Sequence, residues 1–475
     1  MKLEALTQWK PSHHNAAQLD ALLSEAIRED EHKIVVLDDD PTGVQTVHGV
    51  FVYTNWDMDS IRSGFQEKNK LFYILTNSRG LTNAETTQIH REIADRVDRV
   101  AAETSRPYFF ISRSDSTLRG HFPAETEAIQ EELEKRTGVT IDGEILCPFF
   151  KEGGRLTIDG THYVQYGDEL MPAAETEFAQ DKTFGFSHSY LPAYIQEKTT
   201  GRFLAESVVH ISLSLLRNQD FDAIERLLQA CEQFQKVCVD AIDEDDLKVF
   251  AIAVYRCMKR GKRFLFRSAA SLVKVLGGIT TKSLLTFDEM IHAQTQHGGM
   301  VVVGSHTAKT TRQLAELLQM KNTVPISFQS GLVRTNHQAF EQEITRCVKE
   351  AEGAIRQGKV AVCFTERELL PTANMSKEDI LRQSVMISEG VQKLVALLSV
   401  CPSFIVAKGG ITSSDIGTKA LCVRRAEVMG QIIPGVPVWK AGPESRFPDI
   451  PYIIFPGNVG EDHSLREAVS KLIPA

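Results

Sequence analysis

Residues 33–43 read KIVVLDDDPTG, a short apolar run that ends in three aspartates and a Pro-Thr-Gly turn. Similar runs recur up to residue 269, and amphipathic stretches such as 83–104 and 123–136 separate them. This alternation is typical of a parallel sheet covered by helices, so we predict an α/β fold. The further strands predicted in this half are 71–77, 107–114, 144–150, 236–242 and 263–269.

The second half of the chain has the same pattern without a sequence repeat. Helical periodicity covers 341–356 and 377–398. A chain of 475 residues is too long for a typical single core, and the pattern weakens between Gly277 and Gly299. We therefore predict two domains, 1–285 and 286–475, each with a largely parallel sheet flanked by helices. The strands predicted in the second domain are 300–305, 324–328, 359–365, 403–409, 436–441 and 451–457.

Composition argues against several classes of protein. The net charge of -9 is unlike the basic face of most nucleic-acid-binding proteins. The N-terminus lacks the apolar core of a signal peptide, and no apolar stretch is long enough to span a membrane. The eight cysteines form no Cys-x-x-Cys pair, so we expect free thiols rather than a zinc site. We expect a soluble, cytoplasmic protein.

Polar residues follow the first strand, where ligands bind in open parallel sheets. Asp38, Asp39 and Asp40 are adjacent, and their mutual repulsion is costly unless a cation or hydrogen-bond donors offset it. They could deprotonate or orient a substrate hydroxyl. The alternative is an exposed Asp-Pro turn with a helix cap.

The third strand is followed by a denser motif, RSDSTLRGH (113–121). Arginine can bind a carboxylate through two hydrogen bonds, and Ser, Thr and Asp can bind sugar hydroxyls. This inventory suits a polyhydroxy acid better than a solvated loop. The polar segment 153–194 has no clear period, so we predict an irregular active-site loop region. Within it, we expect His162 to be structural rather than catalytic.

Two strands of the second half lead into small-residue loops and helix N-termini. These loops are GSHT (304–307) and GGITSSD (409–415), and a glycine turn, FPGNVG (455–460), follows the last strand. Glycine lets the backbone approach a ligand, and the amides of a first helical turn attract phosphate. The alternative for Thr412 and Asp415 is a capping box. Because neither a Walker motif nor a dinucleotide fingerprint occurs, these residues alone indicate a phosphate-binding protein without a named reaction.

Together these motifs resemble the four-carbon acid sugar kinase family, which includes D-threonate, D-erythronate and 3-oxo-tetronate kinases. The resemblance rests on DDPTG (39–43), SRSDSTLRG (112–120), GGRLTIDGTHY (153–163) and the two loops GSHT and GGITSSD. The motifs match in order from Asp39 to Gly460, which is nearly the whole chain. The DDxTG and DSTLRG pair is specific, and the glycine loops support it.

The resemblance implies an N-terminal acid-sugar domain, a C-terminal ATP domain and phosphorylation of a terminal hydroxyl in the cleft between them. We predict that Asp39 or Asp40 is the base, that Arg113 and Arg119 hold the acceptor carboxylate, and that Mg²⁺ bridges the phosphates. No metal ligand is assigned. The acceptor-site candidates are Thr42, Arg113, Asp115, Ser116, Thr117, Arg119 and Arg155. The nucleotide-site candidates are Ser305, Thr307, Gly409, Gly410, Ile411, Thr412, Gly457 and Asn458.

Three alternatives remain open from the sequence. The chain could phosphorylate another small hydroxy acid or sugar, or it could be a non-catalytic sensor of a sugar acid or nucleotide. The third alternative, an NAD-dependent dehydrogenase, lacks its fingerprint. The expected partners are an acid sugar and ATP, without nucleic acid or membrane, and a homo-oligomer stays open.

Overall fold

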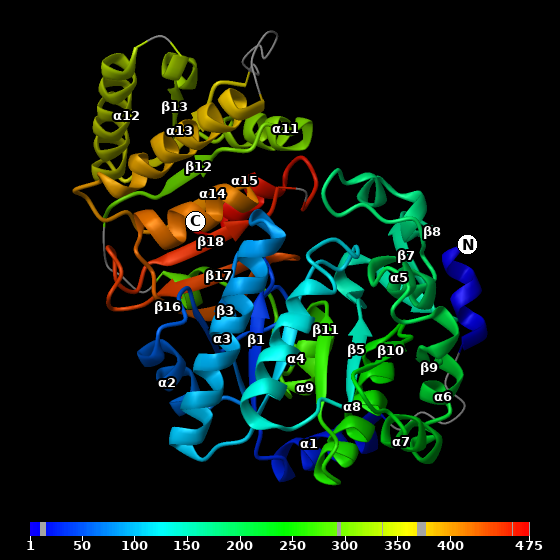
Figure 1. The fold of residues 1–475 in the computed structure, drawn as a ribbon. Coiled ribbons are helices and arrows are strands. Elements are labelled where there is room, and N and C mark those ends of the chain that lie inside the picture. Colours follow the sequence, from blue (N-terminus) through cyan, green and yellow to red (C-terminus); the bar gives the residue numbers. More distant parts are fainter. Residues whose placement is uncertain (10–15, 292–295, 335, 368–376, 458, 475) are drawn as a thin grey trace. The chain divides into compact units, whose positions relative to one another are not determined.

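The computed structural model describes residues 1–9, 16–291, 296–334, 336–367, 377–457 and 459–474. The chain divides into two compact units. The first unit comprises Met1–Thr46 and Asn55–Thr281, and the second comprises Val47–Thr54 and Lys282–Ala475. Each unit contains a sheet with helices packed against it, as expected for the α/β class (Figure 1).

The sheet of the first unit has the strand order β3-β1-β4-β11-β5-β10-β9, and every neighbouring pair is parallel. Its central strands are buried on both faces, which explains their unbroken apolar sequences. The strands of this sheet are β1 (Lys33–Asp38), β3 (Leu71–Leu75), β4 (Tyr108–Arg113), β5 (Gly143–Cys147), β9 (Val209–Ile211), β10 (Gln235–Val239) and β11 (Phe264–Ser268).

The helix predicted over 83–104 is present as α3 (Asn83–Thr104), and a capping box of Thr82 and Glu85 starts it. The helix predicted over 123–136 is present as α4 (Ala124–Thr137). The other helices of this unit are α1 (Ala16–Glu29), α2 (Met58–Gln66), α5 (Leu191–Lys198), α6 (Leu213–Arg217), α7 (Phe221–Gln229), α8 (Glu244–Lys259) and α9 (Ala270–Leu276).

The segment 153–194, predicted to be irregular, is partly regular. It contains a small antiparallel sheet of β6 (Arg155–Ile158), β7 (Thr161–Tyr166) and β8 (Glu169–Pro172). Burial alternates along β7, where His162 and Val164 point inward. Polar residues lie on both faces of these strands, so the alternation of buried and exposed positions could not be recognised in the sequence. The prediction of an irregular loop was therefore wrong.

In the second unit, five parallel strands have the order β13-β14-β12-β15-β18, and β17, β16 and β2 extend the sheet in antiparallel pairs. Its apolar core includes Phe404, Phe455 and Leu465. The strands are β2 (Val50–Tyr53), β12 (Met300–Val303), β13 (Thr323–Phe328), β14 (Val360–Thr365), β15 (Ile405–Lys408), β16 (Arg425–Ile433), β17 (Val436–Ala441) and β18 (Pro451–Phe455). The helices are α10 (Phe287–Met290), α11 (Ala308–Leu317), α12 (His337–Arg356), α13 (Lys377–Ala396), α14 (Gly410–Asp415) and α15 (Ser464–Ser470).

Strand register brings the predicted motifs of the first unit to one edge. Asp38 at the end of β1 lies opposite Leu75 of β3 and Arg113 of β4. Arg113 in turn lies opposite Ser268 at the end of β11. Because all four strands are parallel, the residues that follow them meet at the carboxyl edge of the sheet.

Candidate functional site

The three aspartates after β1 differ sharply in burial. Asp38 and Asp39 are buried, whereas the Asp40 side chain is 20 % exposed. Arg113 lies against them, with its Nη1 atom 3.4 Å from Asp38 Oδ1 and 3.9 Å from Asp39 Oδ1. A Cβ atom on Gly43 would lie 2.0 Å from both Asp38 carboxylate oxygens, so only glycine fits the turn beside Asp38. The cluster is therefore a buried charged network rather than an exposed turn.

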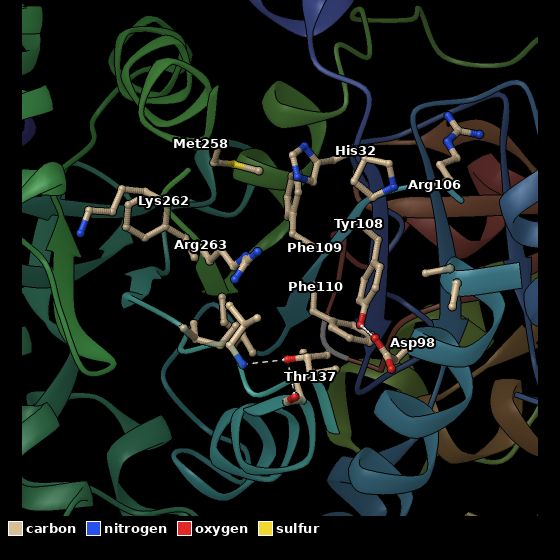
Figure 2. A pocket seen from close by; sticks show the side chains of 18 of the residues that line it. His32, Asp98, Arg106, Tyr108, Phe109, Phe110, Thr137, Met258, Lys262 and Arg263 are labelled. Atoms are coloured by element: carbon tan, nitrogen blue, oxygen red, sulfur yellow. Dashed lines mark hydrogen bonds between the residues drawn. The ribbon is translucent and has the colours of Figure 1, made fainter. Parts of the chain in front are cut away.

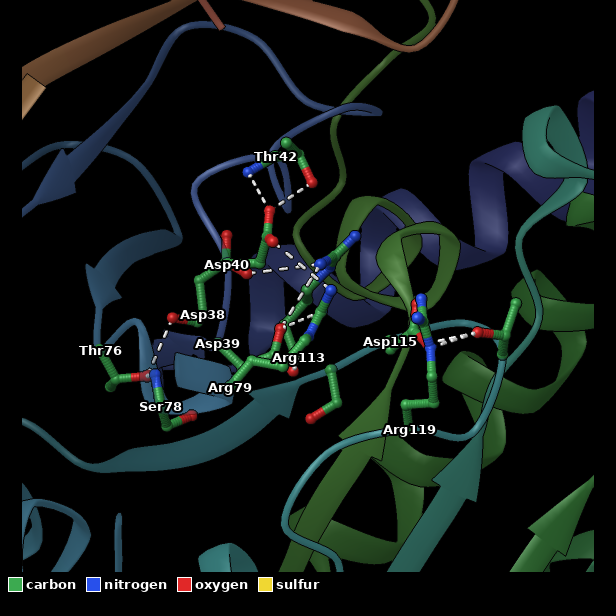
Figure 3. A network of polar contacts seen from close by, with 12 residues as sticks. Asp38, Asp39, Asp40, Thr42, Thr76, Ser78, Arg79, Arg113, Asp115 and Arg119 are labelled. Carbon is green, nitrogen blue, oxygen red and sulfur yellow. Dashed lines mark hydrogen bonds and ion pairs between the residues drawn. The ribbon is translucent and has the colours of Figure 1, made fainter. Parts of the chain in front are cut away.

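Arg79, which the sequence analysis did not single out, is a main counter-charge of this cluster. It follows β3, and its guanidinium donates to Asp39 Oδ1 at 2.6 Å and to Asp40 Oδ2 at 3.4 Å (Figure 3). Its position after a predicted strand was the available signal. Arg79 also lowers the pKa of Asp115, so it links the aspartate cluster to the second motif.

The pKa values of the three aspartates in the cluster are shifted in different directions. Burial raises the pKa of Asp38 to about 8, although Arg113 opposes this effect. Burial also raises the pKa of Asp39 despite the nearby Arg79. For Asp40, burial alone would raise the pKa, but Arg79 and the hydrogen bonds from Thr42 lower it below its ordinary value. Asp40 is thus a partly exposed carboxylate that stays ionised at neutral pH.

Thr42 holds one oxygen of Asp40 in place. Its backbone N–H donates to Asp40 Oδ1 at 2.8 Å, and its hydroxyl donates to the same atom at 2.5 Å. This is the local turn that Asp and Thr favour two residues apart. The second oxygen of Asp40 faces Arg79.

A second buried network lies near the aspartate cluster, and its residues were also absent from the predicted site. Arg267 at the end of β11 donates from Nη1 to Glu125 Oε2 and to Ser114 Oγ, each at 2.6 Å. Ser78 donates to the other Glu125 oxygen at 2.8 Å. Because Glu125 and Arg267 lie on helix α4 and strand β11, only the fold brings them together.

The turn that contains Asp115 and Arg119 is held by its own polar groups. Arg119 Nε donates to Asp115 Oδ2 at 2.7 Å, and the Thr117 hydroxyl bonds the same carboxylate. Burial would raise the pKa of Asp115, but Arg79 and Arg119 lower it well below its ordinary range. Ser116 and Thr117 are buried, so the dense inventory of polar groups in this motif is largely internal.

Arg155 lies beside this turn and shares an aromatic neighbour with Arg119. The two guanidinium carbons lie 5.1 Å (Arg119) and 5.7 Å (Arg155) from the centre of the Phe178 ring. The buried Nε atom of Arg155 has no hydrogen-bond partner among the described residues. Asp181 Oδ2 lies 3.8 Å from Arg119 Nη1. Two guanidinium groups therefore lie against one aromatic ring, and each can bind a carboxylate through two hydrogen bonds.

His162 has a structural role in the small sheet. Its Nε2 lies 2.8 Å from the carbonyl oxygen of Ser116, and its Nδ1 lies 2.9 Å from Thr157 Oγ1. Nε2 must donate to the carbonyl, so Nδ1 accepts from the threonine hydroxyl. Burial lowers the pKa of His162 to about 4, which keeps the ring neutral. The ring therefore anchors the Asp115 turn.

In the second unit, the three predicted loops follow three neighbouring parallel strands, β12, β15 and β18. Thr307 caps α11, and its side chain accepts from Thr310 N at 3.2 Å. A Cβ atom on Gly409, whose φ is 120°, would lie 3.3 Å from Ser305 Cβ, and one on Gly457 would lie 3.9 Å from Ser305 Oγ. The loops thus form one glycine-lined cluster with backbone amides and hydroxyls.

Around this cluster, Gly410 and Ile411 begin helix α14, and the Ile411 side chain is 75 % exposed. The capping box considered for Thr412 and Asp415 is absent, because α14 starts at Gly410 and Thr412 lies inside its first turn. Asp415 instead accepts from Ser388 Oγ at 2.7 Å. The predicted residue Asn458 lies outside the described residues.

Lys408, a further residue missed by the sequence analysis, joins two of these loops. Its Nζ donates to the carbonyl oxygens of Pro456 and Gly457, at 2.6 and 3.3 Å, and lies 4.2 Å from the centre of the Phe455 ring. Burial lowers the pKa of Lys408 to about 7. The signal was a lysine at the end of an apolar strand, directly before two glycines.

Comparison with protein families gives two matches that together span most of the chain. A sugar-binding N-terminal domain matches residues 34–276, and a nucleotide-binding C-terminal domain matches residues 300–465. The chain belongs to the four-carbon acid sugar kinase family. A search of curated proteins found no match.

Solved structures agree with this family fold. A Haemophilus influenzae protein of the family DUF1537 has a TM-score of 0.62 at 18 % identity, and the match covers 92 % of this chain and all of that one. A Salmonella typhimurium LT2 protein with the provisional description of a tRNA synthase has a TM-score of 0.64 at 16 % identity, covering 92 % and 98 %. At such low identity these likenesses support the fold alone.

Three further features concern the described residues alone. None of their helices is both long and apolar enough to cross a bilayer. All eight cysteines lie in the described part, and each is a free thiol as predicted. No three His, Cys, Asp or Glu side chains in that part are grouped so that they could hold a metal ion. In this family member, the aspartate cluster and the Asp115 turn fall in the sugar-binding domain, and the glycine loops fall in the nucleotide-binding domain.

Proposed function

We propose that this chain is an ATP-dependent kinase that phosphorylates the terminal hydroxyl of a four-carbon acid sugar, such as threonate, erythronate or 3-oxo-tetronate. In this proposal, residues 1–285 bind the acid sugar and residues 286–475 bind ATP. The observation that carries it is the combination, in a sugar-binding domain, of the ionised carboxylate of Asp40 with the guanidinium groups of Arg119 and Arg155, which lie against the same Phe178 ring. A nucleotide-binding domain in the same chain supports phosphoryl transfer.

Arg119 and Arg155 hold the acceptor carboxylate in this proposal. The orphaned Nε of Arg155 supports this role, because a buried donor without a partner is costly unless a ligand satisfies it. Asp115 binds the hydroxyl groups of the acceptor in this proposal. Ser116 and Thr117, which are buried, and Thr42, whose hydroxyl bonds Asp40, position the site. Arg113 is only 5 % exposed and faces Asp38 and Asp39, so in this proposal it stabilises the aspartate cluster instead of holding the acceptor carboxylate.

Asp40 is the proposed general base. It accepts the proton of the attacking hydroxyl while a bond forms between that oxygen and the γ-phosphorus and the bond to the leaving diphosphate breaks. Asp39 is more deeply buried, and its carboxyl group lies 2.6 Å from Arg79 Nη2, so we assign it the role of orienting Arg79. Mg²⁺, when bound to the phosphates, would offset their negative charge.

The phosphates are proposed to bind the glycine-lined loops of the second unit. Gly409, Gly410, Ile411 and Thr412 supply backbone amides at the start of α14, and Ser305 and Thr307 add hydroxyls. Gly457 allows the third loop to lie close to Ser305. Asn458 remains a candidate residue of the nucleotide site. Lys408 positions Gly457 by bonding its carbonyl oxygen.

The proposal is tested with a panel of four-carbon and neighbouring sugar acids, each with and without ATP and Mg²⁺. We expect ADP release that depends on one or a few four-carbon acids, and a product heavier by one phosphoryl group. ATP binding without acceptor-dependent ADP release would contradict the proposal and favour a sensor. ADP release only with longer or neutral sugars would contradict the substrate class.

A further inference from the structure

A cavity of about 510 Å³ lies at the opposite, amino-terminal edge of the first unit's sheet. Its wall includes the first residues of β4 and β11, together with parts of α3 and α4 (Figure 2). Its volume is within the range of small-molecule sites. The Asp115 turn and Arg267 lie at the carboxyl ends of β4 and β11, so the cavity is separate from the candidate site.

The lining of this cavity is mainly apolar and aromatic. The Tyr108 and Phe110 rings meet edge to face with centroids 5.5 Å apart. Such walls favour a flat or ring-sized apolar group. The larger apolar side chains at the cavity include Phe109, Phe110, Leu133, Ile141, Met258, Phe264 and Leu265.

The polar groups around the cavity are mostly satisfied. Asp98 accepts from the Tyr108 hydroxyl at 3.1 Å and from Arg136 Nε at 3.1 Å. Lys262 Nζ donates to Asp142 Oδ1 at 3.1 Å and to the Cys231 carbonyl oxygen at 2.7 Å. The remaining cations at the rim are also engaged, since His32 Nδ1 bonds Asp30 and Arg106 Nη1 donates to the Phe65 carbonyl oxygen.

Arg263 differs from these groups. Its backbone N–H is bonded to Asp142 Oδ2 at 2.8 Å, but within the described ranges its guanidinium has neither a hydrogen bond nor an ion pair. Figure 2 shows this guanidinium among the lining side chains, whereas the Lys262 ammonium points away from them. Arg263 is exposed, so its solvated guanidinium, which has no protein partner within the described ranges, lies at the rim of the apolar cavity.

We propose that this cavity binds a small organic monocarboxylate, with its apolar part against the aromatic wall and its carboxylate on Arg263. The planar guanidinium matches a carboxylate through two parallel hydrogen bonds. A single uncompensated cation offsets one negative charge, so a dianionic phosphate ester fits less well. The proposal does not depend on the kinase assignment, because none of these residues belongs to the candidate site.

The probe is 2-naphthoate, whose fluorescence is titrated with the full-length protein, and the neutral control is 2-naphthamide. We expect saturable binding of the acid and much weaker binding of the amide. Arg263→Met should weaken naphthoate binding by about 10- to 100-fold, the range expected for hydrogen bonds to a charged group. Arg226→Met, at an exposed arginine outside the cavity, is the matched control and should bind as the wild type does.

A second variant tests the cavity itself. Ala102 lines the cavity but is exposed, so Ala102→Trp should fold normally and obstruct the space. We expect naphthoate affinity to fall at least tenfold with an unchanged melting temperature. The proposal is overturned if wild-type protein does not bind naphthoate, if the amide binds equally well, or if Arg263→Met and Ala102→Trp both bind normally.

Discussion

The Arg79 guanidinium donates from Nη2 to Asp39 Oδ1 at 2.6 Å, across 40 residues of sequence. This contact joins the ends of β3 and β1, and the same arginine reaches Asp40. Three successive carboxyl groups would repel one another without such a partner. Arg79 is therefore the residue that makes the DDD sequence compatible with a buried position.

Replacing Arg79 should destabilise the first unit. In Arg79→Met, the buried carboxyl of Asp39 loses its main counter-charge, and removal of one partner of a buried pair typically costs about 3 kcal/mol. Denaturant unfolding would measure the loss of free energy of unfolding. Arg91→Met removes an exposed arginine paired with Glu131 and should change stability by less than about 0.5 kcal/mol. Equal stability of the two variants would contradict the role of Arg79.

Asp40 should be essential for turnover. Asp40→Asn keeps the shape of the side chain but removes the base, so we expect kcat to fall by about 10² to 10⁴. ATP binding to the isolated full-length variant, measured by calorimetry, should persist. Asp59→Asn is the control, because the Asp59 side chain is 93 % exposed. Wild-type turnover in a folded Asp40→Asn protein would refute the assignment.

Arg155 should act on the acceptor and not on the nucleotide. Arg155→Met should raise the acceptor KM by about 10- to 100-fold, since a hydrogen bond to a charged group is lost, while the KM for ATP stays the same. The control is Arg202→Met, at an arginine that is 57 % exposed and pairs with Glu127. If both KM values change together in Arg155→Met, the arginine supports the fold rather than the acceptor.

Gly409 should be required for nucleotide binding. Its φ of 120° is strained for any residue with a side chain, at a cost of about 1 to 3 kcal/mol. Gly409→Ala should weaken ATP binding about tenfold or more, with acceptor binding unchanged. Gly353→Ala is the matched control, because its Cβ would meet nothing within 4 Å in helix α12. Unchanged ATP affinity in Gly409→Ala would exclude this loop from the nucleotide site.

Asp38 should make stability fall as pH rises. Its pKa is about 8 in the folded protein, against an ordinary value of 3.8, so between these values the folded state retains a proton that the unfolded chain releases. The free energy of unfolding then decreases by up to about 1.4 kcal/mol per pH unit. Asp40 and Asp115, whose pKa values are lowered, act oppositely, but only in more acidic solution.

The measurement is the difference in unfolding free energy between wild type and Asp38→Asn from pH 4 to 8. Asparagine is neutral at every pH, so the variant should become steadily more stable relative to the wild type as pH rises. A difference that does not vary with pH would show that Asp38 is ionised in the folded protein.

The sequence by itself determined the local elements and the motifs. Strands such as β1 and β4 are buried on both faces and read as unbroken apolar runs, and α3 carries its own capping box. The sequence also indicated the family, because the family motifs DDPTG and DSTLRG are each contiguous in the chain. These features depend on residues close together in the chain, where periodicity and turn chemistry are directly readable.

Only the tertiary structure decided which charges meet. Arg79, Glu125 and Arg267 lie on separate elements, and strand order and register bring them beneath the aspartates and the Asp115 turn. The same holds for Val47–Thr54, which belongs to the second unit although the first unit surrounds it in sequence. Burial then shifted the pKa values of Asp38 and Lys408, and Arg79 and Thr42 lowered that of Asp40, because a pKa depends on neighbours and solvent that no linear pattern encodes.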